Sequence, residues 1–371
     1  MPETMNDIPA ELTLSGRHLN RTQLLEYAHT LSRQEAEEWK HSLGRFLIQW
    51  IDSHPYINVT TSGSTGLPKT MAISKKAMIA SARLTGEFFN LKTGAQALLC
   101  LRAGYIAGLM MVVRAMVYQM NLIIVPPNQS PLEFISSETN IDFAAMLPVQ
   151  VMNSLNREVL KPKLEAIDTL IIGGAPIAPS LESRIKTLKN RVFATYGMTE
   201  TIAHIAARRI SGKAFSRNFS LLPGITISTD GRGCLVANVP YLDKNPVVTN
   251  DVVHIVSPSK FRWLGRYDNV INSGGVKLFP EVIEQKIASL ISNRFFIASV
   301  SDVKLGEVPV LVIEKPEPCT QTYIDEIRVK LVGILKKTEL PDHIYCVPAF
   351  EEGENEKINR ERTMKKLAEE Y

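Results

Sequence analysis

The sequence predicts an α/β protein in which a large domain built on a mainly parallel sheet is followed by a small α+β domain. Between residues 56 and 201, short β-rich runs alternate with longer segments of helical period, the pattern of strands joined by crossover helices. From 205 to 256 the runs shorten and are separated by Gly, Pro, Asn and Asp, as in antiparallel sheets. After Arg266 a third pattern, of about 100 residues, mixes helices with short strands.

The elements of the large domain follow in order. A helix at 34–51 is expected to cover one flank of the sheet, and Ser74 and Pro179 are good helix starts. The predicted strands are 57–61, 97–101, 122–126, 143–147, 169–172 and 192–195, with helices such as 76–89 and 180–188 between them. Alternating runs such as 225–228 and 234–237 then predict antiparallel strands.

The small domain is predicted from its own sequence of elements. These are a helix at 281–289, strands at 295–300 and 309–313, a helix at 321–335 and a short strand near Tyr345. The polar segment 265–269 could absorb backbone rotation between the two bodies. We therefore expect domains at 1–267 and 268–371.

Composition excludes several classes of protein. The chain has 371 residues, 45% of them apolar and 22% charged, and a net charge of +4, too small to indicate a nucleic-acid partner. The most apolar stretch, 103–125, is interrupted by Arg114, Gln119 and Asn121, so no membrane span is expected. Residues 1–9 lack the features of a signal peptide, which favours a cytoplasmic protein.

The four cysteines are far apart in the sequence. Cys100, Cys234, Cys319 and Cys346 form no Cys-x-x-Cys pair, so neither a zinc site nor a disulfide framework is indicated. We expect buried thiols at all four positions.

One segment has the composition of a polyphosphate-binding loop. It follows a predicted strand and concentrates four hydroxyls, two glycines and a lysine: Thr61, Ser62, Gly63, Ser64, Thr65, Gly66, Leu67, Pro68 and Lys69. Hydroxyls and backbone N–H groups donate to phosphate oxygens, and the lysine adds a point charge. Pro68 before the lysine excludes a Walker A loop. The alternative is a Ser/Gly-rich hairpin turn without a ligand.

This loop resembles that of the adenylate-forming superfamily, which includes acyl-CoA ligases and adenylation domains. Two further segments match superfamily motifs in the right order: Gly173, Gly174, Ala175 and Pro176, then Tyr196, Gly197, Met198, Thr199, Glu200 and Thr201. The resemblance implies that the first segment and Tyr196 line the adenine site, Thr199 contacts the α-phosphate and Glu200 holds Mg²⁺. An aromatic face suits a nucleobase and a carboxylate suits a hard cation, although Glu200 alone could be a solvated loop acid.

The resemblance continues toward the C-terminus with two departures. Thr249-Asn250-Asp251 resembles a motif whose Asp binds the ribose, with Asn250 in place of Gly. Lys357 sits where the family carries its adenylation lysine, but Glu356 replaces the preceding Gly. The remaining family positions are Arg266 for the ribose, Asp268 as the hinge, and Gly274 and Gly275 beside the pantetheine arm of CoA.

The acyl pocket is expected in the segments between the shared motifs. The run 101–114, together with the near absence of the usual N-terminal subdomain, looks most like the short o-succinylbenzoate–CoA ligases of menaquinone synthesis. That acid keeps a second carboxylate, so a cation or strong donor is needed. The candidate substrate residues are Arg102, Tyr105, Gly108 and His204. Arg102 could instead be a surface residue and His204 an interior histidine, and we expect Arg114 to be structural.

The expected activity is therefore an ATP-dependent carboxylate–CoA ligase with an acyl-adenylate intermediate. Lys357, Thr199 and Lys69 are the expected catalytic residues, acting by positioning and charge stabilisation. ATP, Mg²⁺ and CoA are the expected cofactors and co-substrates. The expected partners are small molecules, with no nucleic acid and no membrane. A homodimer is possible. Two alternatives remain: another aryl- or acyl-CoA ligase, and a non-catalytic relative that binds nucleotide or acyl-CoA.

Overall fold

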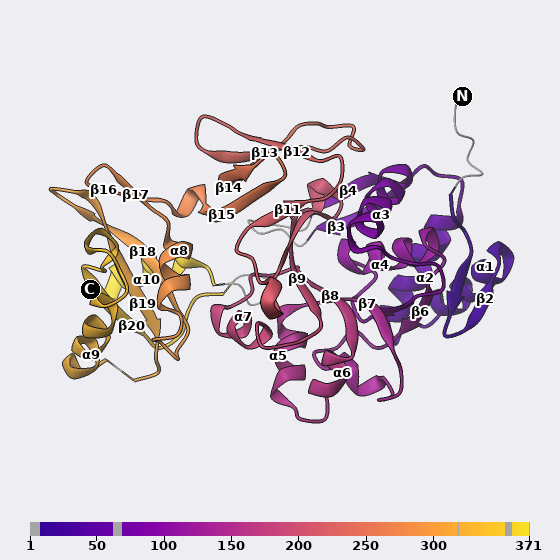
Figure 1. The fold of residues 1–371 in the computed structure, drawn as a ribbon, viewed down its shortest axis with the longest axis horizontal. Coiled ribbons are helices and arrows are strands. Elements are labelled where there is room, and N and C mark those ends of the chain that lie inside the picture. Colours follow the sequence, from indigo (N-terminus) through magenta and orange to yellow (C-terminus); the bar gives the residue numbers. More distant parts are fainter. Residues whose placement is uncertain (1–7, 62–68, 318, 353–357, 371) are drawn as a thin grey trace.

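The computed structural model describes residues 8–61, 69–317, 319–352 and 358–370. Within these ranges, a thirteen-stranded sheet formed by strands between residues 12 and 266 carries the first part of the chain, and a five-stranded sheet lies between residues 271 and 347. Figure 1 shows the second sheet and its helices at the left, reached through the long antiparallel strands β14 and β15 (Val247–Ser257 and Lys260–Arg266).

The middle of the large sheet is parallel. Its strands lie in the order β9, β8, β7, β5, β6, and every neighbouring pair is parallel. These strands are β5 (Gln96–Leu99), β6 (Asn121–Ile124), β7 (Ile141–Met146), β8 (Ile167–Ile172) and β9 (Arg191–Gly197). At one edge, the hairpin of β1 (Leu12–Leu14) and β2 (Arg17–Leu19) adds to β6. Both faces of the parallel part are covered, as this type of sheet requires.

Helices cover the two faces of the sheet in two groups, each with its own hydrophobic core. The first core contains residues of α1 (Arg21–Ser32), α2 (Glu38–Ile51), α3 (Lys75–Phe89) and α4 (Ile106–Val117). The second contains residues of α5 (Pro148–Asn156), α6 (Lys161–Glu165) and α7 (Pro179–Ile185). Figure 1 shows the two groups in separate places, with α1 to α4 at the right and α5 to α7 below.

The large sheet continues beyond β9 as an antiparallel sheet. The order is β9, β10, β11, β15, β14, β13, β12. The new strands are β10 (His204–Arg209), β11 (Phe219–Leu221), β12 (Thr226–Thr229) and β13 (Cys234–Asn238). A hairpin of β3 (Tyr56–Thr61) and β4 (Lys69–Ser74) forms a separate two-stranded sheet. None of the helices in the described part of the chain is long and apolar enough to cross a membrane.

The second sheet is mixed and small. Its order is β17, β16, β19, β18, with β20 parallel to β19. The elements are β16 (Ile271–Ser273), β17 (Val276–Leu278), α8 (Pro280–Ile287), β18 (Phe295–Asp302), β19 (Gly306–Glu314), α9 (Gln321–Val332), β20 (His343–Val347) and α10 (Arg360–Glu370). Helices α8 and α9 pack on a core that contains Ile283, Ile297 and Ile327. A second core contains Phe296, Phe350 and Leu367.

The predicted α/β class, the strands and most helices are confirmed, with differences at the N-terminus. The helix predicted at 34–51 begins at Glu38, and a separate helix, α1, precedes it. The start of α1 carries a capping box, in which the Asn20 side chain accepts from the Gln23 N–H. That signal was present in the sequence and predicts the missed helix.

The prediction of four free thiols is wrong for two of them. Cys319 and Cys346 form a disulfide, whereas Cys100 and Cys234 are free and buried. The pair is separated by 27 residues in sequence, but its Cα atoms lie 5.8 Å apart. Helix α9 returns the chain so that β20 pairs with β19, which brings Cys346 back to the segment just before α9.

Candidate active site

A cluster of polar and aromatic side chains brings β9 together with β14 and β15, although β10 and β11 lie between them in the order of the large sheet. The Tyr196 hydroxyl donates to Asp251 Oδ2 at 2.7 Å, and Trp263 Nε1 donates to Asp251 Oδ1 at 3.1 Å. The Arg266 guanidinium lies 3.7 Å from the same Oδ1. Asp251 and Arg266 are direct partners in the pairing of β14 and β15. The sheet register therefore assembles three of the residues predicted for nucleoside binding, and adds Trp263.

The protonation state of Tyr196 is fixed by its surroundings. Burial, and then the negative charge of Asp251, hold the pKa of the phenol well above its usual value. The hydroxyl is therefore a donor at any working pH. The ring makes edge contacts with Phe261 and Phe219, with centroids 5.1 Å and 5.8 Å away. An oriented aromatic ring beside a carboxylate and an arginine can bind a nucleoside, by packing on the base and by hydrogen bonds to the ribose.

The loop after β8 approaches the end of β9 closely. A Cβ atom on Gly173 would lie 2.4 Å from Thr195 Oγ1, so this position accepts only glycine without rearrangement. Gly174 has φ +80°, the left-handed region that favours glycine. Gly174, Ala175 and Pro176 are exposed. The loop thus forms an open backbone surface at the carboxyl end of the parallel strands, where α/β proteins bind ligands.

The turn after β9 places Thr199 and Glu200 at the same end of the sheet. The turn is held by Thr201, whose hydroxyl accepts from the Met198 N–H at 3.0 Å and lies 2.7 Å from the Ala203 carbonyl. Ile202 has φ +67°, a costly conformation for a β-branched residue. Glu200 is exposed and Thr199 is partly buried. The strained turn keeps the Glu200 carboxylate in solvent, available to a cation.

On the opposite face of the strands lies a buried pair, His204 and Arg114. A bulge in β10 between His204 and Ala206 turns His204 toward α3, where its ring centroid lies 6.0 Å from that of Phe89. Tyr196, in contrast, packs on the second core. His204 Nε2 and Arg114 Nε are buried and have no hydrogen-bond partner among the described residues.

Electrostatics distinguish the two groups of this pair. Burial, together with the positive charge of Arg114, holds the pKa of His204 well below its usual value, so the imidazole is neutral. Burial lowers the pKa of Arg114 to about 10, which still leaves the guanidinium charged at neutral pH. Within the described ranges, Arg114 forms no ion pair with an acid; its NH1 lies 3.6 Å from Met111 Sδ. The cation of this region is therefore Arg114, which we expected to be structural.

The other predicted substrate residues lie nearer the surface. Arg102 and Tyr105 are exposed just before α4. Gly108 is buried in the first turn of α4, where a Cβ atom would lie 2.3 Å from the Arg102 carbonyl oxygen. Gly108 therefore lets α4 pack against the preceding loop, whereas Arg102 projects from that loop into solvent.

The remaining predicted residues fall in two places. Asp268 lies between the two sheets, where its Oδ2 accepts from Asn250 at 3.5 Å and lies 3.7 Å from Arg266. Gly274 and Gly275 form the β16–β17 turn, both with positive φ. Thr61 and Lys69 pair across the ends of β3 and β4. Ser62, Gly63, Ser64, Thr65, Gly66 and Lys357 lie outside the described residues.

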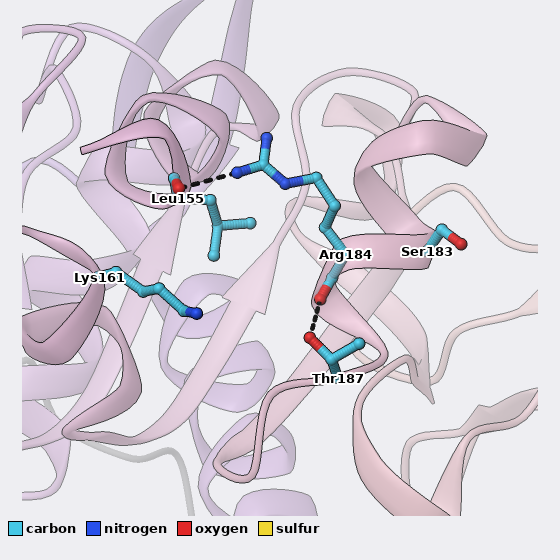
Figure 2. Close-up of a pocket in the computed structure, with 5 residues that line it drawn as sticks. All are labelled: Leu155, Lys161, Ser183, Arg184 and Thr187. Carbon is cyan, nitrogen blue, oxygen red and sulfur yellow. Dashed lines mark hydrogen bonds between the residues drawn. The ribbon is translucent and has the colours of Figure 1, made fainter. Parts of the chain in front are cut away.

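A cavity of about 260 Å³ lies elsewhere, between α5, α6 and α7 (Figure 2). Its lining residues are Leu155, Lys161, Ser183, Arg184 and Thr187. Arg184 already donates to the Leu155 carbonyl at 2.8 Å and to Asn156 Oδ1 at 2.7 Å, so it caps the C-terminus of α5. The C-termini of crossover helices lie away from the carboxyl ends of the strands, so this cavity is separate from the Tyr196 cluster.

Comparison with known proteins identifies the family. The model of the family described as AMP-binding enzyme matches residues 14–225, more than half of the chain. The chain belongs to the AMP-binding enzyme family. A solved structure from Dyadobacter fermentans, an acyl-CoA synthetase (AMP-forming)/AMP-acid ligase II-like protein, is 35% identical, with a TM-score of 0.62, and the match covers 92% of this chain and 97% of that one.

Other similar AMP-binding enzymes share a narrower description. The 2-succinylbenzoate–CoA ligase of Haemophilus influenzae is 25% identical over 330 residues, which is 85% of this chain and 71% of the relative. A probable 2-succinylbenzoate–CoA ligase of Mycobacterium tuberculosis is 22% identical over 337 residues, 86% of each chain. The o-succinylbenzoate coenzyme A synthetase of Bacillus subtilis, solved with ATP and magnesium ion, is 14% identical with a TM-score of 0.73, covering 97% of this chain and 98% of that one. This last match supports the fold.

Two residues of the site could not be found from short motifs. Trp263 lies on β15 and reaches Asp251 only through the pairing of β14 with β15. Arg114 lies in the middle of an apolar helix, and its burial without an acidic partner appears only in the folded chain. A signal for Arg114 was nevertheless present, because a charged residue inside the run 106–117 needs a partner when that run is buried.

Proposed function

We propose that this AMP-binding enzyme joins 2-succinylbenzoate to CoA at the expense of ATP, a step of menaquinone biosynthesis. In the first half-reaction a substrate carboxylate oxygen attacks the α-phosphorus of ATP and pyrophosphate leaves. In the second, the CoA thiolate attacks the acyl carbon and AMP leaves. Membership of the family supports the adenylating chemistry, and the names of the similar ligases support the acid and the thiol.

The Tyr196 cluster supports the nucleoside part of the proposal. Adenine would pack on Tyr196 beside the backbone of 173–176. The ribose hydroxyls would donate to Asp251, because each carboxylate oxygen has two lone pairs and Tyr196 and Trp263 each occupy one. Arg266, close to Asp251, would complete the ribose contacts. Trp263 is thus a further residue we assign to holding Asp251 in place.

The exposed Glu200 fits a magnesium ion carried by ATP. Among the described residues no group of three His, Cys, Asp or Glu side chains could hold a metal ion alone. Magnesium is usually bound by one or two carboxylates together with substrate phosphates, which matches a single exposed acid. The ion would neutralise charge on the phosphates. On the sequence resemblance, we also propose phosphate contacts at Thr199, Lys69, Lys357 and the loop 61–66.

Arg114 is the observation that carries the choice of substrate. A charged guanidinium buried without an acidic partner is unfavourable, and a carboxylate from outside the chain would compensate it. 2-Succinylbenzoate has two carboxylates, of which only one is activated, so the other can meet Arg114. His204, neutral and adjacent, would then act as a donor rather than a counter-ion. Tyr241 lies within electrostatic range of Arg114 and donates to the Thr201 carbonyl at 3.1 Å, which links this region to the Glu200 turn.

The presence of two separate sheets supports two domains with different roles in the two half-reactions. We propose domains at 1–267 and 268–371, joined at Asp268, that change orientation between the half-reactions, with Gly274 and Gly275 beside CoA in the second. ATP and CoA as co-substrates favour a cytoplasmic enzyme. A homodimer remains a prediction that sedimentation equilibrium would test.

The test compares acids and arginine variants. Purified protein is incubated with ATP, Mg²⁺ and CoA plus 2-succinylbenzoate, benzoate or a medium-chain fatty acid, and AMP and thioester are followed by mass spectrometry. Thioester should form from 2-succinylbenzoate. Arg114→Met should raise KM for 2-succinylbenzoate about a hundredfold, corresponding to about 2.7 kcal/mol for a lost charge-assisted pair, with no change toward benzoate.

The matched control is Arg102→Met, because Arg102 is an exposed arginine close to α4. It should behave like the wild type. If Arg102→Met rather than Arg114→Met loses the preference for 2-succinylbenzoate, the assignment of the second carboxylate is wrong. If benzoate is turned over in preference to 2-succinylbenzoate, the proposed substrate is wrong but the proposed ligation chemistry still holds. If the protein binds ATP but turns over no acid, the proposed ligase activity is wrong.

A further inference from the structure

Glu281, near the start of α8, touches three parts of the chain that lie far apart in sequence. Its Oε1 accepts a hydrogen bond from Asn269 Nδ2 in the segment between the two sheets. The same oxygen lies 3.9 Å from NH1 of Arg360, the first residue of α10. Its Oε2 faces Gly265, near the end of the last strand of the large sheet. One carboxylate therefore contacts both structural units and the connection between them.

The contact with Gly265 depends on the absence of a side chain there. A Cβ atom on Gly265 would lie 2.2 Å from Glu281 Oε2 and 3.0 Å from its Cδ. Gly265 also has φ +153°, which other residues rarely adopt. Glu281 Oε2 is buried there and accepts no hydrogen bond from any described residue. This oxygen would gain a water partner if the carboxylate moved away, so the contact is one that rotation of the unit can release.

On its other side, Glu281 contacts the N-terminus of α10 through Arg360. Arg360 donates to Glu284 Oε2 at 2.9 Å and to the Ile297 carbonyl at 3.2 Å. Glu284 Oε1 in turn accepts from the Ile297 N–H at 2.8 Å. Burial is the main reason that the pKa of Glu284 is raised, and the neighbouring Glu281 adds to it, while Arg360 opposes it. Arg360 is thus held rigidly to α8 and β18.

We propose that Glu281 is a positioning residue that sets the orientation of the C-terminal unit for adenylation. The inference rests on the proposed function, because it assigns the present arrangement to the first half-reaction. Glu281 ties the end of β15 and Asn269 to Arg360, which follows the predicted adenylation lysine, Lys357, by three residues. The second half-reaction then uses an arrangement in which Glu281 has left Gly265.

The variants Glu281→Ala and Gly265→Ala test this role from the two sides of the contact. Each should slow pyrophosphate release at saturating ATP and 2-succinylbenzoate about tenfold, and leave thioester formation from supplied acyl-adenylate within about twofold. Glu326→Ala, at an exposed acid on α9, is the matched control and should change neither step. The double variant should lose less than the product of the single losses, because the added Cβ no longer meets a carboxylate. Equal slowing of both half-reactions, or strictly multiplicative losses, would overturn the proposal.

A distance measurement tests the same role without any turnover. Val303 and Val159 are fully and largely exposed, at 104% and 68%, and lie in the two units. Spin labels on Val303→Cys and Val159→Cys should give one narrow distance in the otherwise unchanged protein and a broadened distribution with Glu281→Ala. An unchanged distribution would overturn the proposal. If no acid yields pyrophosphate even with the wild type, the proposed function fails, while this distance still decides whether Glu281 sets the orientation.

Discussion

Asp251 shows how much of the site depends on a single side chain. Its two carboxylate oxygens accept hydrogen bonds from Tyr196 and Trp263, and the Arg266 guanidinium lies close to one of them. Asp251 is itself positioned by its own strand, because its N–H donates to Thr249 Oγ1 at 3.1 Å and that hydroxyl lies 2.9 Å from the Leu235 carbonyl. Thr249 is therefore more than a spacer in the Thr-Asn-Asp segment, since it fixes the backbone from which Asp251 reaches the cluster.

His204 gives a prediction about pH. Its folded-state pKa lies well below the usual 6.5, so His204 binds a proton more tightly in the unfolded chain than in the folded protein. The stability due to neutral His204 is complete above about pH 6.5 and is lost as the pH falls toward the folded-state pKa, by up to about 1.4 kcal/mol per pH unit. The wild type should therefore lose stability below pH 6.5 faster than His204→Gln.

Urea unfolding from pH 5 to 8 measures this difference. His29→Gln serves as the control, because His29 is exposed on α1 and its removal should leave the pH profile unchanged. Parallel profiles for wild type and His204→Gln would contradict a neutral buried imidazole.

At the residue scale the sequence predicted the members of short motifs and missed residues that enter through folding. Tyr196, Asp251 and Arg266 each stand in a recognisable segment, and the structure brings them together. Arg102 was preferred to Arg114 because a loop arginine looks more available than one inside an apolar helix. Arg114 is buried and Arg102 is exposed, which is why the proposed function assigns the second carboxylate to Arg114.

The hairpin β3–β4 illustrates how an element is held when it does not join the main sheet. A two-stranded sheet is barely stable alone, and here its base is fixed by Lys75, which is fully buried. Lys75 Nζ donates to Asp52 Oδ1 at 2.9 Å and to the Asp52 carbonyl at 3.0 Å, and its N–H donates to the Pro55 carbonyl. The residues just before and just after the hairpin are thereby joined.

This ion pair predicts unequal costs for its two partners. The Asp52 side chain is 36% exposed and that of Lys75 is not exposed at all. Asp52→Ala would leave a buried ammonium group with one carbonyl, which should cost about 3 kcal/mol. Lys75→Met would leave an aspartate that water can reach and should cost about 1 kcal/mol. Urea unfolding of both variants checks the asymmetry, and a larger loss for Lys75→Met would refute it.

Element prediction succeeded where the period of the sequence was clear. The parallel strands were found because short apolar runs alternate with helical segments. The strands β1 and β2 were missed because three-residue strands carry almost no periodic signal. Helix α1 was missed although its cap was visible, because Leu24, Ala28 and Leu31 form only a narrow apolar stripe.

At the scale of the whole molecule, the proposed hinge at Asp268 gives the clearest prediction. Asp268→Pro fixes φ near −65° and restricts Tyr267 as well. Adenylation should continue within about threefold, while thioester formation should fall at least about tenfold, because rotation of the second unit is blocked. Separate assays of pyrophosphate release and of acyl transfer from supplied acyl-adenylate measure the two steps, with Asp268→Ala as the flexible control. Full thioester formation by Asp268→Pro would argue against rotation at this residue.

The disulfide predicts the stability of the second unit. Closing a loop with a separation of 27 residues should stabilise the folded state by about 3.5 kcal/mol in the chain-entropy description. Cys319→Ser should therefore lower the unfolding midpoint, and reductant should lower that of the wild type to a similar value. Cys234→Ser, at a free cysteine, should keep its response to reductant. A wild type insensitive to reductant would contradict the pairing.

The continuity of the large sheet lay beyond sequence reasoning. The sequence predicted a parallel region and an antiparallel region, but their union depends on β10 pairing antiparallel with β9. That pairing follows the turn at 198–203, and no local pattern specifies it. The cysteine pair is a similar case, because only the return of β20 onto β19 brings the two sulfur atoms together.

In the proposed function, the nucleotide and the second carboxylate bind on opposite faces of the large sheet, and the bulge in β10 accompanies the turn of His204 toward α3. Tyr196 packs on the second core, while His204 and Arg114 lie on the face covered by α3 and α4. Substitutions in α3, α4 or their loops can therefore reshape the acid-facing side without moving the nucleotide-facing side. A chain with this layout can acquire a new acid specificity in small steps while its shared chemistry is preserved throughout.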